Sequence, residues 1–117
     1  MKVIRIYGVG NSGTNTIWLT STKKVNFADG TSDYLTGMFI HSNDDDLRKI
    51  KVGQKFSRLQ AMFREGTDGA SANHIHFAFG KGKVKGNGWT KNTAGKWVLT
   101  TTGGCFPVDK LLYIDRA

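Results

Sequence analysis

The sequence has little of several features that identify common classes of protein. Cys105 is the only cysteine among 117 residues, which excludes an intramolecular disulfide framework and favours the interior of a cell. No run of 18 apolar residues occurs, so no membrane-spanning helix is expected. Residues 1–7 carry charges through their apolar stretch and lack the core of a signal peptide. These absences together predict a cytoplasmic protein.

Acidic residues are missing from a long part of the chain. Residues 69–108 contain no Asp or Glu, although the formal net charge of the whole chain is +8. The lysines of this stretch are Lys81, Lys83, Lys85, Lys91 and Lys96. Such a basic region predicts an anionic partner, for instance nucleic acid, a nucleotide, a cell-wall polymer or an acidic protein. The alternative is a lysine-rich face that only keeps the protein in solution.

The composition favours a β-rich fold. Glycine is abundant, with 15 residues, and threonine and aromatic residues are frequent, whereas helix-forming runs are few. The chain has one proline, Pro107, and no linker-like segment. We therefore predict a single domain over residues 1–117, mainly β, with mostly antiparallel sheet and little helix.

Strands are predicted where apolar and polar residues alternate or β-branched residues gather. The predicted strands are residues 3–7, 15–22, 34–41, 61–65, 73–80 and 96–101, and 108–114 forms a last strand or turn. Residues 83–85 extend the strand that precedes them. The only predicted helix is a short one at residues 44–50, where a carboxylate caps the first turn.

Two of the three histidines lie two residues apart, in the run Asn-His-Ile-His-Phe at residues 73–77. Residues two apart on a strand share a face, so His74 and His76 are expected to point the same way, with Ile75 and Phe77 opposite. Neighbouring imidazoles are good zinc ligands, but a zinc site usually needs three protein ligands. His41 ends a predicted strand and gains significance only if it lies beside the other two.

Three further features have simpler explanations. Residues 8–13 match the G-x-G-x-x-G spacing of dinucleotide sites, but a strand-forming sequence follows where that motif requires a helix, so a hairpin loop is expected. The acidic run at residues 44–46 lacks the ligand order of a calcium loop and is expected to be a solvated helix cap. Cys105 is expected to be a small buried residue.

Lysines alternate with small residues between Gly80 and Trp89. On an extended segment Lys81, Lys83 and Lys85 would line one face, with Trp89 nearby as a stacking surface. Such a row can hold a phosphate backbone or a polysaccharide, or it can protect an exposed sheet edge from aggregation. The predicted anion-binding residues are Lys81, Lys83, Lys85, Lys91, Lys96 and Trp89.

Three separate motifs, in order and spacing, resemble the lysostaphin-type zinc metallopeptidases, the peptidoglycan endopeptidases of phage endolysins and bacterial cell-wall enzymes. The family's strand that ends in a catalytic histidine looks like residues 38–41. Its helical turn and Val-Gly-Gln turn look like residues 47–55, and its loop and His-x-His strand look like residues 66–77. The resemblance covers residues 3–79, and residues 80–89 and the chain from Pro107 onward are similar to phage endolysin versions.

The resemblance implies a role for each histidine. His76 would be a zinc ligand, and His74 and His41 would orient the attacking water and stabilise the oxyanion. The family's other two zinc ligands, an upstream His followed four residues later by an Asp, have no counterpart, because no histidine precedes His41. The chain is then a natural short derivative, a fragment, or one subunit of a site that a second subunit completes.

Three functions follow from these observations. The first is a non-catalytic, phage-encoded binding protein on a metallopeptidase scaffold. It engages an anionic ligand, nucleic acid or a nucleic-acid-binding host enzyme and inhibits host antiviral defence in the bacterial cytoplasm, with no cofactor. The second is a zinc-dependent peptidoglycan endopeptidase whose metal site is completed in trans, and the third is a cell-wall-binding module. A sheet edge exposed by missing strands also predicts a homo-oligomer.

Overall fold

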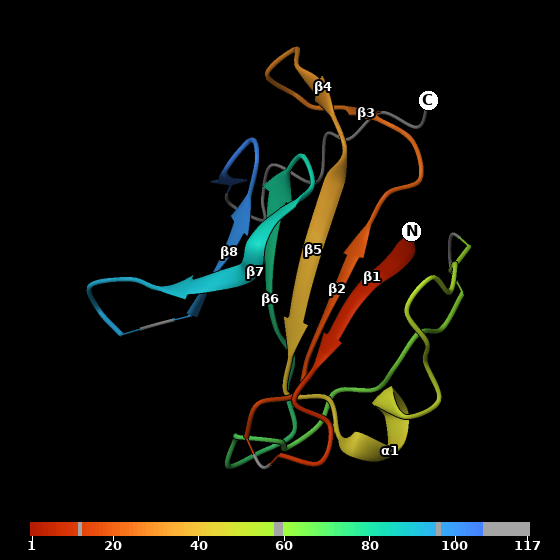
Figure 1. Cartoon of the computed structure of the whole chain (residues 1–117), viewed down its shortest axis with the longest axis vertical. Helices are drawn as coiled ribbons and strands as arrows, with labels where there is room; N and C mark the ends of the chain where they lie inside the picture. Colours follow the sequence, from red (N-terminus) through yellow and green to blue (C-terminus); the bar gives the residue numbers. More distant parts are fainter. Residues whose placement is uncertain (12, 58–59, 96, 107–117) are drawn as a thin grey trace. The chain divides into compact units, whose positions relative to one another are not determined.

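A computed structural model of the chain describes residues 1–11, 13–57, 60–95 and 97–106 (Figure 1). The described residues are mainly β, with antiparallel sheets, which confirms the predicted fold class. The elements are β1 (Lys2–Tyr7), β2 (Thr16–Thr20), β3 (Val25–Asn26), β4 (Ser32–Asp33), β5 (Leu35–Ile40), α1 (Asp44–Leu47), β6 (His76–Lys81), β7 (Val84–Lys91), β8 (Trp97–Thr101) and β9 (Cys105–Phe106).

The strands form one larger sheet and two hairpins. The larger sheet has the strand order β1-β2-β5-β6-β9, and β3 pairs with β4 and β7 with β8. The β3–β4 hairpin surrounds the turn at Asp29 and Gly30, where Gly30 has a φ of 84° and Asp29 Oδ1 accepts the Thr31 N–H. Glycine accommodates that backbone conformation, which explains the turn between two very short strands.

Contacts along the chain divide it into two compact units. The first unit consists of Met1–Leu19 and Met38–Phe77, and the second of Thr20–Gly37 and the chain from Ala78 onward. The first unit contains the helix and all three histidines. The second contains the hairpins and the described lysines of the acid-free stretch, which we define as residues 69–108.

The core of the first unit lies between β1, β2 and the chain that follows β5. Its buried side chains are Val3, Ile17, Leu19, Leu47, Ile50 and Phe56. A segment around the predicted Val-Gly-Gln turn runs along β1, with Val3 donating to Gln54 O at 2.8 Å and Gly53 donating to Val3 O at 2.7 Å. β1 lies at the edge of the larger sheet, so this segment covers part of that edge.

The second unit is held by polar contacts as well as by strand pairing. The hydroxyl of Thr36 lies 2.9 Å from that of Thr20 and donates to Gly82 O at 2.6 Å, and all three residues are buried. In the β7–β8 pair, Trp89 lies opposite Leu99, with an irregular register between Val84 and Trp89. These contacts satisfy polar groups that burial would otherwise leave without partners.

Several predicted elements need correction. Residues 61–65 are not a strand, and the strand expected at 73–80 begins only at His76. Lysines 83 and 85 do not extend β6, because Gly82 adopts a φ of 85° and the chain then starts β7. The strand β7 and the short strands β3, β4 and β9 were not predicted. The element expected at residues 108–114 lies outside the described residues.

The helix α1 is shorter than predicted and is capped differently. Its N-cap is Asn43, and the side chain of Asn43 makes no hydrogen bond to the helix; its Oδ1 accepts the Thr67 N–H instead. Among the helices of the described residues, none is long and apolar enough to cross a membrane.

Candidate functional site

The three histidines lie together in the first unit. The ring centroid of His41 is 4.5 Å from that of His74 and 6.1 Å from that of His76. We refer to His41, His74 and His76 as the histidine cluster. The sequence indicated that His41 would matter only beside the other two, and the structure brings them to that arrangement.

His41 is held in an unusual backbone conformation. Its φ is 84°, and among the described residues it is the only one other than glycine with a positive φ. Its backbone N–H donates to Asn15 O at 3.2 Å, and its carbonyl accepts the Asp68 N–H at 3.2 Å. Its ring Nδ1 lies 2.7 Å from Asp68 O. Neighbouring residues thus fix both the backbone and the imidazole.

His74 and His76 reach the cluster from different local structures. His74 precedes β6 and pairs with Gly66 in an isolated antiparallel bridge, and its ring Nδ1 lies 3.0 Å from Ala72 O. His76 is the first residue of β6. Both histidines are exposed. The sequence predicted one continuous strand that carries both histidines on the same face. Only His76 lies on that strand, but both residues belong to the histidine cluster.

An aromatic pair belongs to the same strands. Phe77, next to His76, is 38% exposed, and its ring lies 6.3 Å from Phe39, two residues before His41. Phe39 also contacts Phe63 edge to face at 5.4 Å. Phe77 was expected to pack on the strand face opposite the histidines. It is instead an exposed apolar side chain, next in sequence to His76.

Carboxylates hold the glycine loop, which we define by Gly8, Gly10 and Gly13. Gly10 N–H donates to Asp44 Oδ2 at 3.2 Å, and Gly13 N–H donates to Asp68 Oδ1 at 3.1 Å. The loop leads into β2 and not into a helix, and side chains of the protein occupy these two N–H groups. This arrangement agrees with the hairpin-loop interpretation of the G-x-G-x-x-G spacing.

Asn15 and Asp68 are the site residues that the sequence did not reveal. The Asn15 N–H donates to Asp68 Oδ2 at 2.8 Å, and the buried Asn15 amide donates to Asp44 Oδ1 at 2.7 Å and to Ser42 O at 2.9 Å. Hydrogen bonds from Asn15 and from Gly10 lower the pKa of Asp44 below its ordinary value. Asp44 and Asp68 thus tie the start of β2 to distant loops.

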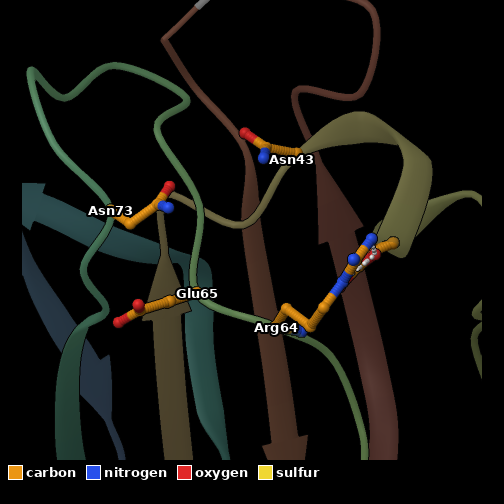
Figure 2. A pocket seen from close by; sticks show the side chains of 5 residues that line it. Asn43, Arg64, Glu65 and Asn73 are labelled. Carbon is orange, nitrogen blue, oxygen red and sulfur yellow. Dashed lines mark hydrogen bonds and ion pairs between the residues drawn. The ribbon is translucent and has the colours of Figure 1, made fainter.

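The acidic run at residues 44–46 is not a solvated cap. The side chain of Asp46 is only 10% exposed and accepts hydrogen bonds from the Arg64 guanidinium, at 2.7 and 3.1 Å, and from the Arg64 N–H at 2.6 Å. These bonds lower the pKa of Asp46 to about 2. In Figure 2 the Arg64 side chain reaches toward α1, whereas Glu65 extends the opposite way in a hollow that Asn43 and Asn73 also line.

The zinc site that the resemblance implies is not complete among the described residues. Among the residues that the structure describes, no three His, Cys, Asp or Glu side chains are arranged so that they could ligate one. A zinc site usually needs three protein ligands. A metal at His76, as the resemblance implies, would need ligands from outside this group.

The predicted lysine row is divided by the structure. Lys81 ends β6, its side chain is 20% exposed, and its Nζ binds the carboxylate of Asp29 and, at 2.8 Å, the Thr31 hydroxyl. The hydrogen bond from Lys81 lowers the pKa of Asp29 well below its usual range. Lys81 is therefore occupied within the second unit.

The other predicted anion-binding residues lie along β7 or close to it. Lys83 and Lys85 are exposed, and the Lys83 Nζ lies 4.9 Å from the centre of the Tyr34 ring. Lys91, also exposed, ends β7, and Trp89 is half-buried opposite the buried Leu99. Lys96 lies outside the described residues. We refer to Lys83, Lys85 and Lys91 as the exposed lysines.

Cys105 is not a fully buried residue. It is exposed as a whole, but its Sγ lies 2.7 Å from Leu99 O, and partial burial raises the pKa of the thiol above its ordinary value. A raised pKa makes a thiol less reactive. Nothing in this environment points to a catalytic cysteine.

No protein-family model matches the chain, and no curated protein matches it.

Proposed function

We propose that this protein is a non-catalytic binding protein, on a scaffold similar to that of the lysostaphin-type peptidases, and that its partner is anionic. The observation that carries the proposal is the position of the exposed lysines, in a sequence of forty residues, 69–108, without one Asp or Glu. Lys81 differs from them, because its ammonium group binds the carboxylate of Asp29. The positive charge of the exposed lysines favours a phosphate-bearing partner.

Nucleic acid or a nucleotide is the partner class that we propose first. Lysine ammonium groups along a strand can follow a phosphate backbone, and each neutralised phosphate releases counterions. The resemblance to phage endolysins extends the proposal to a phage protein. Such a protein could inhibit host antiviral defence by binding a nucleotide signal or by blocking a host enzyme that binds nucleic acid.

A salt titration of binding tests this proposal. Fluorescence anisotropy with labelled DNA, RNA and nucleotide probes should give an affinity that falls steeply as ionic strength rises. Combined Lys83→Ala, Lys85→Ala and Lys91→Ala substitutions should reduce the logarithmic slope by about 2 to 3 for duplex DNA, because each phosphate contact contributes about 0.9.

The matched control removes Lys23 and Lys24, which are exposed in the second unit but lie outside the acid-free stretch. Lys23→Ala and Lys24→Ala together should leave most of the affinity. Affinity that is independent of salt, or equally reduced by the control, would rule out the exposed lysines as the main contact.

A zinc-dependent peptidoglycan endopeptidase, with a metal site completed in trans, is the second candidate. The specific observation in its favour is the histidine cluster, which gathers the three residues that the resemblance assigns to the family's site. Elemental analysis of the purified protein should then find about one zinc per chain, lost in His76→Ala, and wall lysis should stop on chelation. Retention of purified sacculi without lysis would instead support a cell-wall-binding module.

A further inference from the structure

Asp68 joins the glycine loop to the histidine cluster through both its side chain and its backbone. Its two carboxylate oxygens accept the N–H groups of Gly13 and Asn15, at 3.1 and 2.8 Å. Its backbone N–H donates to His41 O, and its carbonyl lies 2.7 Å from His41 Nδ1. One residue therefore contacts the loop before β2, the start of β2 and the imidazole of His41.

The contact with Asp68 O determines which ring nitrogen of His41 carries the proton. A carbonyl oxygen only accepts hydrogen bonds, so His41 Nδ1 must be the donor. In a neutral imidazole the other nitrogen, Nε2, then keeps its lone pair. His74 has the same relation to Ala72 O, at 3.0 Å.

The backbone of His41 supports the view that its orientation is functional. A non-glycine residue with a φ of 84° is strained, and such strain persists only where the surroundings determine the conformation. Three hydrogen bonds to Asn15 and Asp68 do so here. Strained residues of this kind gather at binding and active sites.

We infer that Asp68 is a positioning residue, which holds His41 as the Nδ1–H tautomer and presents its Nε2 as a hydrogen-bond acceptor in the histidine cluster. The carboxylate anchors residue 68 to the glycine loop, and the anchored backbone carbonyl selects the tautomer. A ligand at the cluster would then offer His41 a hydrogen-bond donor, such as a hydroxyl or an amide N–H. This inference goes beyond the proposed function and involves none of the exposed lysines.

Long-range proton–nitrogen NMR correlation of the histidine side chains tests the inference directly. Spectra of the full chain at about pH 8, where histidines of peptides are neutral, report the protonation of each ring nitrogen. The wild type should show His41 protonated at Nδ1 and unprotonated at Nε2. Asp68→Ala should lose this single tautomer, and Asp68→Asn, which keeps one acceptor oxygen, should lose it in part.

The matched control is Asp44→Asn. Asp44 also binds the glycine loop and Asn15, but neither of these hydrogen bonds involves His41, so His41 should keep its tautomer. The inference is overturned if wild-type His41 is protonated at Nε2, a result that needs no variant to fold. It is also overturned if a folded Asp68→Ala variant leaves the nitrogen shifts of His41 unchanged.

Discussion

The two units use their charged side chains in different ways. In the first unit, Asp44, Asp46 and Asp68 each accept N–H groups from loops distant in sequence, and so they act as structural ligands of the backbone. In the second unit, one carboxylate binds Lys81, and the exposed lysines have no acidic residue near them in sequence. The three aspartates of the first unit, which look available in the sequence, are therefore committed to the fold.

This difference changes what the net charge of +8 means. A carboxylate that accepts two or three hydrogen bonds is costly to remove and unavailable to a ligand. An ion pair of an exposed lysine contributes little to stability. Substitutions in the first unit should therefore change folding, and those at the exposed lysines should change binding.

The largest effect on stability is expected from Gly66→Ala in the first unit. A Cβ at residue 66 would lie 2.4 Å from His41 O and 2.7 Å from Asn43 N, both backbone atoms. We expect a loss of about 3 kcal/mol in the free energy of unfolding, measured with urea. Gly30→Ala in the second unit is the control, because its φ of 84° is strained but its Cβ would meet no atom within 4 Å. It should lose only about 1 kcal/mol.

Asp46→Asn should have the next largest effect. The variant keeps the shape of the side chain but loses charge-assisted hydrogen bonds to Arg64, so unfolding should require about 2 kcal/mol less. Asp45→Asn, an exposed neighbour in the same helix, should be close to the wild type. Equal losses in the two variants would contradict the structural role of Asp46.

Acid should weaken the protein through the same carboxylates. The folded-state pKa values of Asp44 and Asp46 are lowered, so the stability that they contribute is present above their unfolded pKa of about 3.9 and is lost as the pH falls below it. For Asp46 the loss continues to about pH 2. Urea midpoints measured between pH 6 and pH 2 should fall less steeply in Asp46→Asn than in the wild type.

The smallest effect on stability is expected from the combined alanine substitutions of the exposed lysines. Surface substitutions away from packed groups rarely change stability, so thermal unfolding should lie within about 2 °C of the wild type. Lys81→Ala should lower the unfolding temperature more, since it removes the contacts with Asp29 and Thr31. The reverse order would contradict this difference between Lys81 and the exposed lysines.

The sequence predicts β1, β2, β5 and β8 because their apolar and β-branched patterns are local. The strand predicted at residues 61–65 does not form, because side chains and not a neighbouring strand bind the backbone there. The Arg64 N–H donates to the Asp46 carboxylate, and Arg64 O accepts the Ser42 hydroxyl at 2.8 Å. The prediction also fails at Gly82, because a single residue with a positive φ interrupts the lysine row. Neither a side-chain hydrogen bond to the backbone nor a single positive φ produces a periodic pattern of apolar residues in the sequence.

The candidate site is predictable only in part for the same reason. The spacing of His74 and His76 and the family resemblance indicated a histidine site that includes His41. The role of Asp68 depends on hydrogen bonds to residues as far as 55 positions away, which no local pattern records. The three histidines are therefore visible in the sequence, but the residue that orients one of them is not.

The interleaved path of the chain has a consequence for how the protein is made and divided. Each unit is built from two separate segments, and β1 pairs with residues about fifty positions later. During synthesis β1 must wait for residues 53–56 to emerge before that side of it is paired, and closing such long loops slows folding. No single proteolytic cut can separate the two units from each other, so a single cut under native conditions should yield fragments that remain associated.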